Sequence, residues 1–231
     1  MKQKRFTLAT ICALLASVLI FSCSQEDIYP DSKRVVPENY HPYVKQHKQW
    51  NYGEQIYNED EDTVGWRIKF SYLIEGDTLI NGKGYNKLLA KDAQTYGDEE
   101  WHYVGAVREA LMKVFFVRNE TKTEERVYDF GVQTGNKIKW DDVLWDVGYC
   151  TEIRETTHDF SSRVISLTGI SGGKWNEEYI AVCAEWWEGI GCCEEYNPFN
   201  WKRTSQLISC YEDGQCVFDI DYVIAKRMEW Q

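Results

Sequence analysis

The strongest constraint on the fold is the alternation of apolar and polar side chains over residues 65–74, which read GWRIKFSYLI. Side chains of an extended chain point alternately to opposite faces, so this period of two indicates a half-buried β-strand. Aromatic and β-branched residues, which favour strands, are enriched in it. The apolar residues that share one face are Trp66, Ile68, Phe70 and Tyr72.

Short apolar runs separated by turn signals continue to the end of the chain. Asn81-Gly82 lies between two such runs and is a strong two-residue hairpin signal. Similar breaks occur at Gly135-Asn136 and Asp213-Gly214. No segment after residue 22 carries an apolar stripe of helical period over three turns. The pattern predicts an all-β fold, a single antiparallel barrel or sandwich of roughly ten to twelve strands.

The N-terminus has the features of an export signal. Three basic residues precede a mostly apolar run that ends at Phe21, and the run is shorter than the roughly 20 residues a spanning helix needs. Residues 19–23, LIFSC, resemble a bacterial lipobox, which implies that Cys23 becomes the acylated first residue. The acidic cluster that follows, residues 24–27, resembles the surface-export signal of Bacteroidota lipoproteins.

Proline positions suggest the domain boundary. Three of the four prolines fall between the lipid cysteine and the first strand pattern, which begins near Lys48. The predicted organisation is a signal peptide over residues 1–22, a lipid-anchored polar linker over residues 23–45 and a single all-β domain over residues 46–231.

The charge balance argues against one class of partner. The whole chain has a formal net charge of −11, and removal of residues 1–22 takes away three positive charges and no negative one, which gives −14. A strongly acidic surface repels phosphate backbones, and no Lys/Arg stripe is evident, so we predict no nucleic-acid binding. The predicted attachment to the membrane is the lipid.

The chain contains eight cysteines, and six remain when Cys12 and Cys23 are set aside. An even number in an exported chain favours disulfides. If residues 212–214 form a three-residue hairpin loop, Cys210 and Cys216 lie opposite each other and can bridge. A two-residue loop at Asp213-Gly214 would offset the pair. The bridge is the prediction; the pairing of the other four cysteines stays open.

The stretch AEWWEGIGCCEEY, residues 184–196, concentrates glutamates, tryptophans and cysteines. On a strand Glu185 and Glu188 point to opposite faces, so they cannot easily act as a glycosidase pair there, although a carboxylate from a distant strand could still partner either one. Trp186 shares the apolar face and is expected in the core. Glu188 precedes Gly189, and we expect its carboxylate to bind backbone donors at a bend. The stretch is therefore interpreted as a fold element.

Other motifs with chemical meaning do not fit their sites. GISGG at residues 169–173 matches a nucleophile elbow, but strand pattern follows it where a helix is required. NEDEDT at residues 58–63 lacks the glycine of a calcium loop, and the adjacent cysteines 192 and 193 lack zinc spacing. We assign no catalytic residue and predict no metal and no cofactor.

The ten tryptophans suggest a ligand. Aromatic faces stack on sugar rings, and carboxylates accept hydrogen bonds from their hydroxyl groups. Tryptophans near strand ends or in loops are the better candidates, because binding residues concentrate there. The alternative is that tryptophan serves only for packing. The candidate ligand-binding residues are Trp50, Trp101, Trp140, Trp145 and Trp201.

Five segments occur in an order that resembles a known group of sequences. They read GDTLINGKGYNKL (76–88), GAVREA (105–110), VYDFGVQTGN (127–136), WWEGIG (186–191) and LISCYEDGQCVF (207–218). This set resembles a family of small uncharacterised exported proteins of Bacteroidota, some of them lipid-anchored. Asn136 departs from the aspartate usual in that family. The resemblance implies a β-rich fold and export, and it implies no activity.

Together these features predict a lipid-anchored outer-membrane protein, exposed at the cell surface, that acts as a non-enzymatic binding or interaction module for a glycan or protein ligand. One alternative is a surface hydrolase acting on glycans, which would need two carboxylates roughly 5–10 Å apart in one cleft. Another is a structural subunit of a surface assembly, which would expose a broad apolar patch.

Overall fold

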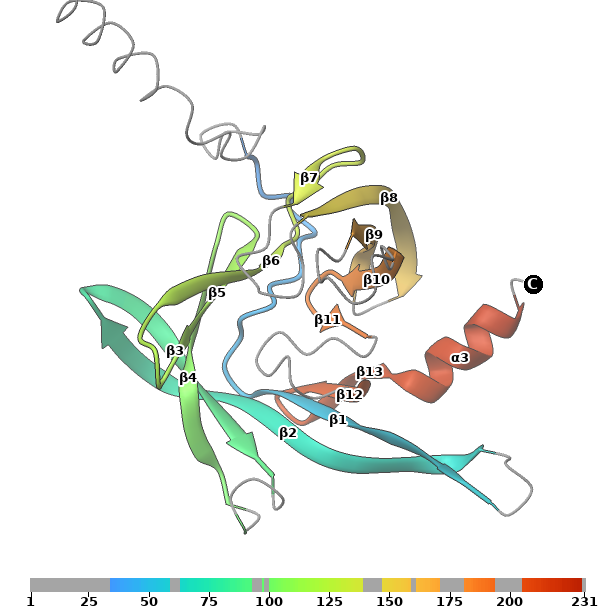
Figure 1. Cartoon of the computed structure of the whole chain (residues 1–231), viewed down its shortest axis with the longest axis horizontal. Coiled ribbons are helices and arrows are strands. Elements are labelled where there is room, and N and C mark those ends of the chain that lie inside the picture. Colours follow the sequence, from blue (N-terminus) through green and yellow to red (C-terminus); the bar gives the residue numbers. More distant parts are fainter. Residues whose placement is uncertain are drawn as a thin grey trace, which may run out of the picture.

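The computed structural model (Figure 1) describes residues 34–58, 63–92, 97, 100–138, 147–158, 161–170, 181–193 and 205–229. This part of the chain forms thirteen strands and one helix. No helix within it is long and apolar enough to span a membrane.

The strands form two antiparallel sheets. The larger has eight strands in the order β13-β12-β1-β2-β3-β4-β5-β6, and the smaller has five in the order β11-β10-β9-β8-β7. The larger sheet is strongly bent (Figure 1). Its strands are β1 (Lys48–Tyr57), β2 (Thr63–Ile80), β3 (Lys83–Lys91), β4 (His102–Ala110), β5 (Lys113–Arg118), β6 (Glu124–Asp129), β12 (Gln206–Glu212) and β13 (Gln215–Asp219). The smaller comprises β7 (Lys137–Ile138), β8 (Val147–His158), β9 (Ser161–Ile170), β10 (Ala181–Trp187) and β11 (Gly191–Cys192). The predicted all-β architecture is confirmed.

Strand β2 joins two parts of the larger sheet. Its first half pairs with β1 and its second half pairs with β3, with a bulge between Ile74 and Asp77. The predicted apolar face is buried at Phe70 and Tyr72, but Ile68 is exposed, Trp66 is only partly buried, and Ser71 of the opposite face is also buried. Strand β12 pairs with β1 from Lys48 to Gly53 and not beyond it. Residues 53–57 and 63–68 therefore continue as a two-stranded extension, called here the β1–β2 arm.

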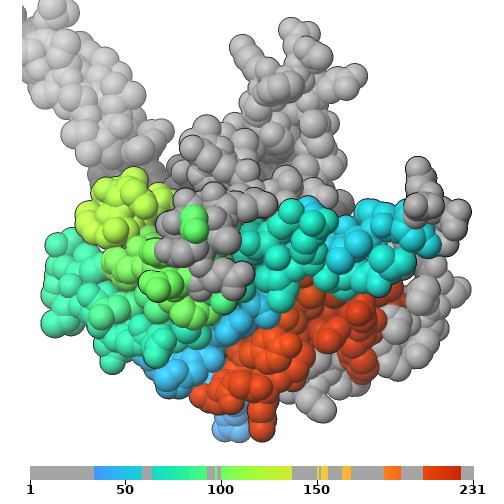
Figure 2. All heavy atoms as spheres, turned by 90° about the horizontal axis from the view of Figure 1, so that it is seen from below, coloured from blue at the N-terminus to red at the C-terminus, as the bar shows by residue number. Residues whose placement is uncertain are grey.

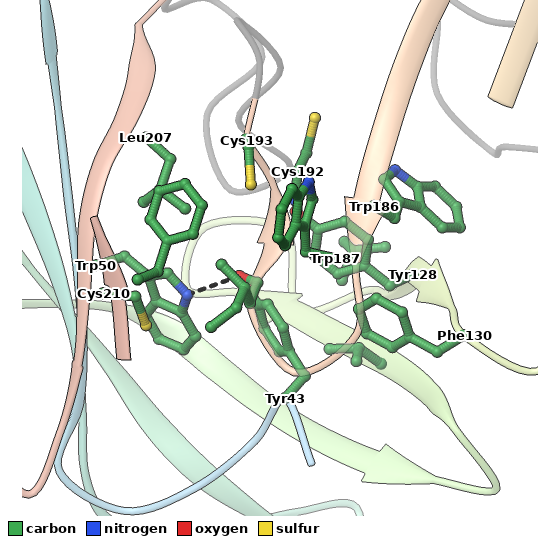
Figure 3. Close-up of a cluster of buried hydrophobic side chains, with 14 of the residues drawn as sticks. Tyr43, Trp50, Tyr128, Phe130, Trp186, Trp187, Cys192, Cys193, Leu207 and Cys210 are labelled. Atoms are coloured by element: carbon green, nitrogen blue, oxygen red, sulfur yellow. Dashed lines mark hydrogen bonds between the residues drawn. The ribbon is translucent and has the colours of Figure 1, made fainter. Parts of the chain in front are cut away.

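One hydrophobic core unites the two sheets (Figure 3). Trp50 of β1 stacks on Tyr43 with ring centroids 4.9 Å apart, and Tyr128 of β6 meets Trp186 of β10 edge to face at 5.2 Å. The indole N–H of Trp50 donates to the carbonyl of Ile190 at 2.9 Å, from the larger sheet to the turn of the smaller one. The described strands thus belong to one domain with a shared core.

Residues 34–47, called here the N-terminal strap, correct the predicted boundary. Tyr43 is fully buried at the centre of the core, and Tyr40 and Val44 pack against it. Figure 1 shows the strap, in blue, running between the two sheets before it enters β1. Residues 34–45 are therefore part of the folded domain and not part of a polar linker.

The C-terminal helix α3 (Ile220–Glu229) was not predicted. Ile220 and Val223 are buried against the core, and Ile224 packs on it in part. The helix begins where the side chain of Asp219 accepts a hydrogen bond from the backbone N–H of Asp221 at 2.9 Å. This is an ordinary helix start, in which an aspartate satisfies a free N–H of the first turn.

The predicted bridge between Cys210 and Cys216 is absent, and both are free thiols. Glu212 pairs with Gln215, so the hairpin loop contains only Asp213 and Gly214. This offsets the cysteines: Cys210 lies opposite Phe218, whereas Cys216 lies opposite Tyr211. Cys210 is buried beside Trp50 (Figure 3), and Cys216 is exposed.

The two thiols should differ sharply in reactivity. Burial raises the pKa of the Cys210 thiol to about 12, and the thiolate is the reactive form. When the folded protein is treated with an alkylating reagent at neutral pH, we expect Cys216 to be modified and Cys210 to stay unmodified until the chain is denatured. Peptide mapping by mass spectrometry checks this. A peptide linking Cys210 to Cys216, or equal modification of both, would contradict the observed register.

Candidate functional site

The turn between β10 and β11 is the first element of the site, and residues 188–191, EGIG, are called here the EGIG turn. Glu188 is fully buried. One carboxylate oxygen accepts the backbone N–H of His41 at 3.2 Å, and the other accepts the Nε–H of Arg163 at 2.7 Å. The interpretation of Glu188 as a carboxylate bound to a backbone donor at a bend is confirmed, and Trp186 lies in the core as expected.

The glycines of the EGIG turn allow the strap to lie directly on it. Gly189 and Gly191 have φ of +79° and +102°, a region that other residues rarely adopt. A Cβ on Gly189 would lie 2.9 Å from the Cβ of His41, and one on Gly191 would lie 2.8 Å from the Tyr43 ring. The turn is therefore shaped to receive the strap.

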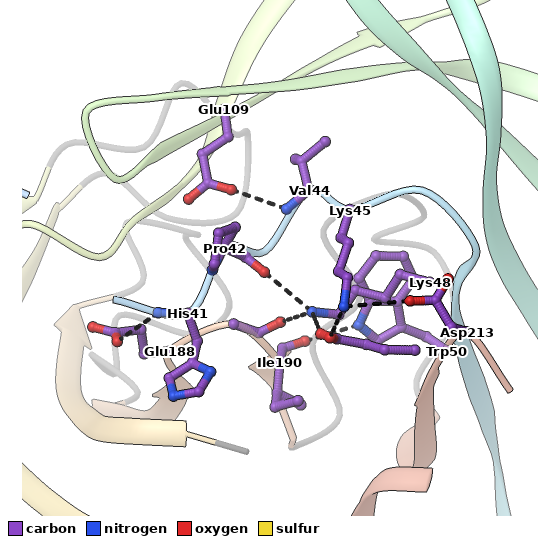
Figure 4. A network of polar contacts seen from close by, with 12 residues as sticks. His41, Pro42, Val44, Lys45, Lys48, Trp50, Glu109, Glu188, Ile190 and Asp213 are labelled. Carbon is purple, nitrogen blue, oxygen red and sulfur yellow. Dashed lines mark hydrogen bonds and ion pairs between the residues drawn. The ribbon is translucent and has the colours of Figure 1, made fainter. Parts of the chain in front are cut away.

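Lys48 is a buried cation where the strap, the EGIG turn and the β12–β13 hairpin meet (Figure 4). Its ammonium donates to the carbonyls of Pro42 at 3.3 Å and of Gly189, and to the carboxylate of Glu212 at 2.7 Å. A buried charge is tolerated only when it is paired and hydrogen-bonded, and Lys48 meets this condition. It thereby joins three segments that are distant in sequence.

Glu109 of β4 holds the middle of the strap. Its carboxylate accepts the hydroxyl of Tyr40 and the backbone N–H of Val44, the latter at 2.9 Å. Desolvation raises the pKa of Glu109, and these hydrogen bonds oppose the rise. Further along, Arg34 forms a two-pronged ion pair with Asp129 of β6, with Nη2 and Oδ2 2.9 Å apart, and both side chains are buried. Together with Glu188, which binds the N–H of His41, Glu109 and Asp129 fix the strap in place.

The tryptophans proposed as ligand-binding residues do not gather into a described surface. Trp50 is 0% exposed, so the expectation that it faces solvent is wrong; its ring is needed between Tyr43 and Cys210 in the core. Trp101 is half-buried. The other three candidates, Trp140, Trp145 and Trp201, lie outside the described residues.

The β1–β2 arm presents an apolar face that the sequence pattern assigned to the core. Val64 and Ile68 are 61% and 55% exposed, and Trp66, between them in the sequence, is partly buried. Tyr57 is also exposed, and its hydroxyl donates to the side chain of Gln55, which pairs with Trp66. In Figure 2 the arm, in cyan, extends past the orange β12–β13 hairpin.

The other face of the arm is polar. Glu54 forms ion pairs with Arg67 at 3.2 Å and with Lys69 at 2.9 Å. Helix α3 borders the arm, since the indole N–H of Trp66 donates to Asp221 at 2.8 Å and Tyr222 beside it is exposed. The arm therefore combines an accessible apolar face with an ion-paired back, and it is the candidate binding surface.

The alternation of β2 is evident from the sequence, but the exposure of its first apolar residues is not. The apolar stripe of β2 continues to Val64, beyond the point where β12 ends, and the local pattern does not reveal where the neighbouring strand stops. The signal that could have identified the arm is the proximity of this stripe to the acidic segment at residues 59–62, which favours solvent.

Within the described ranges, no three side chains among His, Cys, Asp and Glu come together in a way that could hold a metal ion. Comparisons of the chain with protein-family models, with curated proteins and with solved structures found no match. The resemblance to exported Bacteroidota proteins stays a prediction, and any function has to be inferred from the lipobox, the strap and the β1–β2 arm themselves.

Proposed function

We propose that this protein is a lipid-anchored module of the outer-membrane surface, and that it binds a protein partner through the apolar face of the β1–β2 arm. Two features support the anchor: the LIFSC lipobox ending at Cys23 and the acidic cluster directly after it. The exposed apolar face of the arm carries the binding part of the proposal.

The strap limits how far the domain can stand from its anchor. Arg34 is already fixed to Asp129, so only residues 24–33 separate the lipid cysteine from the folded domain. A chain extends by at most about 3.6 Å per residue, so this separation is at most about 40 Å. The domain is therefore held near the membrane, and a partner must reach it there.

The composition of the arm favours a protein over a glycan. Interface centres are enriched in aromatic residues and depleted in charge, and tryptophan is prominent among residues that dominate binding energy. Trp66 lies between the aliphatic residues Val64 and Ile68 in the sequence, while the charges of Glu54 and Arg67 lie on the other face. Aliphatic neighbours add apolar contact for a protein surface and offer no hydrogen bonds to sugar hydroxyls.

The two alternative functions, a glycan hydrolase and a structural subunit of a surface assembly, require other features. A glycan hydrolase needs two carboxylates free to act, but Glu188 is bound to Arg163 and His41, and Glu185 pairs with Arg154. A hydrolase would therefore have to use other carboxylates. A structural subunit of a surface assembly would use the same apolar arm, and the identity of the bound partner distinguishes it from a binding module.

Site-specific photo-cross-linking in cells tests the arm. A photoreactive amino acid replaces Ile68 on the arm or, as a control, Leu79, which is 77% exposed on β2 beyond the bulge. We expect a discrete protein adduct at position 68 that is absent at position 79. The protein identified by mass spectrometry should then bind the purified chain at least about tenfold more tightly than it binds the Ile68→Asp variant. The reason is that loss of a dominant interface contact costs about 2 kcal/mol or more of binding free energy.

Equal adducts at both positions, or unchanged affinity of the Ile68→Asp variant, would exclude the arm as the binding surface. A polysaccharide array probed with the chain from residue 24 covers the glycan alternative. Binding to a glycan that is lost in Trp66→Ala would replace the protein partner with a carbohydrate.

The anchor has its own test. In cells given a fatty-acid probe, we expect the full-length protein to be labelled and its Cys23→Ser variant to be unlabelled. The reason is that the cysteine of a lipobox, here Cys23, carries the acyl chains. The variant should also leave the outer-membrane fraction, since several acyl chains provide the stable attachment. Equal labelling of the two forms would remove the anchor from the proposal.

A further inference from the structure

The turn between β4 and β5 has an unusual composition for its geometry. Ala110 pairs with Lys113, so Leu111 and Met112 alone form the turn, and their φ values are +52° and +65°. Two-residue turns with both φ positive strongly favour Asn and Gly, and a bulky residue at positive φ is an outlier. Such outliers persist where something else requires them, so the turn invites a functional explanation.

Packing explains Met112 but not Leu111. Met112 is buried, and its carbonyl accepts the N–H of Phe130 at 2.8 Å. Leu111 is 42% exposed at the tip of the hairpin. A leucine there gains little from the core, and an asparagine would suit the turn better.

The exposed start of the strap adjoins this hairpin. A Cβ on Gly131 would lie within 3.1 Å of both the Arg34 guanidinium and the Met112 side chain. Six residues after Arg34, Tyr40 donates to Glu109 of the same hairpin. Val35 and Val36, between these two attachments, are 82% and 43% exposed.

We propose that Val35, Val36 and Leu111 form an apolar contact with the bilayer that holds the lipid anchor. The inference rests on the anchored state described above, because this is the end of the domain where the chain arrives from Cys23. Only eleven residues separate Cys23 from Val35. The tether keeps these side chains at a high effective concentration next to the membrane, so a contact too weak to recruit a free protein can form.

Electrostatic attraction does not contribute to this contact with the bilayer. The chain without residues 1–22 has a net charge of −14, and an anionic surface repels it. Attraction must therefore come from the apolar side chains and the covalent link. The contact would orient the domain, with the strap end toward the lipid.

The test uses the chain from residue 24 with an N-terminal hexahistidine tag in place of the acylated cysteine. The tag binds vesicles of phosphatidylcholine and phosphatidylglycerol that contain nickel-chelating lipid. In a Cys216→Ser background, which removes the one thiol that is exposed among the cysteines whose burial is described, an environment-sensitive fluorophore is placed on Leu111→Cys or, as a control, on Leu79→Cys. We expect a spin-labelled lipid to quench the fluorophore at position 111 at least about twofold more than that at position 79, since only the former reaches the acyl boundary.

A second variant separates contact from folding. Leu111→Asn should melt at the same temperature as the parent or higher, because asparagine suits the turn. With the fluorophore on Val36→Cys, the same change should reduce quenching. Equal quenching at positions 111 and 79, or quenching at position 36 that Leu111→Asn leaves unchanged, would overturn the proposal. Because the tether is artificial, these results do not depend on whether Cys23 is acylated in cells.

Discussion

A chain that begins at residue 46 is expected not to fold, whereas one that begins at residue 24 should unfold cooperatively. The shorter chain lacks Tyr43, which is fully buried among Trp50, Tyr128 and Phe130. Loss of a large buried aromatic side chain costs about 3–5 kcal/mol. The shorter chain also leaves Glu109 without the donors it has on the strap. The sum is comparable with the whole stability of a typical domain, about 5–15 kcal/mol.

Point variants keep this prediction testable if the short chain is insoluble. We expect Tyr43→Ala to lower the free energy of unfolding by about 3–5 kcal/mol in urea titrations followed by circular dichroism. Tyr57→Ala, which removes the same side chain from an exposed site on the arm, should change it by no more than about 0.5 kcal/mol. Equal effects of the two variants, or a cooperative transition of the chain from residue 46 at an unchanged midpoint, would show that the strap is dispensable.

Arg163→Met should destabilise the domain by about 3–5 kcal/mol, the usual cost of removing one partner of a buried ion pair. Glu188 is fully buried, and its carboxylate would lose the guanidinium that lies 2.7 Å away. Arg163 also donates to the carbonyl of Phe130 at 2.7 Å, so the variant loses a bond between β9 and the end of β6. Urea-induced unfolding of the purified chain from residue 24 gives the measurement.

A double variant and a matched control isolate the ion pair. Arg163→Met combined with Glu188→Gln should cost less than the sum of the two single changes, with a coupling of about 1–3 kcal/mol, because no buried charge then remains unpaired. Arg154→Met removes an arginine that pairs with Glu185 near the surface, and it should cost about 1 kcal/mol or less. If the two arginine variants have the same effect, burial of the Glu188 pair does not matter.

The part of the fold that local patterns determine was predictable. The alternation of β2 identified Phe70 and Tyr72 as core residues, and Asn81-Gly82 does form a two-residue turn, between Ile80 and Lys83. Period-two patterning and turn residues act over a few positions, so they can be read without knowing the partner strands. Glu188 was also interpreted correctly, since a carboxylate before a glycine bend needs donors.

The strap could not be predicted in this way. Pro37 and Pro42 indicate an irregular chain, which is typical of a linker, but irregular backbone can be buried when it finds hydrogen-bond partners. The partners of the strap's backbone here are the carboxylates of Glu188 and Glu109, which accept the N–H groups of His41 and Val44 and are far away in sequence. The apolar residues between the prolines are the only hint in this segment that it is buried. Whether they are buried depends on how the two sheets are arranged, which the local sequence does not reveal.

The sequence patterns also missed helix α3 and wrongly favoured a bridge between Cys210 and Cys216, each for a specific reason. Helix α3 buries Ile220, Val223 and, in part, Ile224, a stripe of helical spacing too short for the three-turn criterion. The Cys210 bridge depended on one residue of loop length, and the two-residue loop was the alternative left open. A change of one residue in register alters which side chains face each other, which is why hairpin disulfides are hard to assign from sequence.

If the domain is anchored at the cell surface as proposed, the buried strap also limits how it could be shed. A protease that cuts between His41 and Lys48 would separate Tyr43 from the domain, or leave it on a short loose end, and would release an unfolded product. Only a cut on the N-terminal side of Arg34 preserves every contact of the strap with Asp129, Glu109 and Glu188. An intact form released from such an anchor by proteolysis should therefore begin between residues 24 and 34.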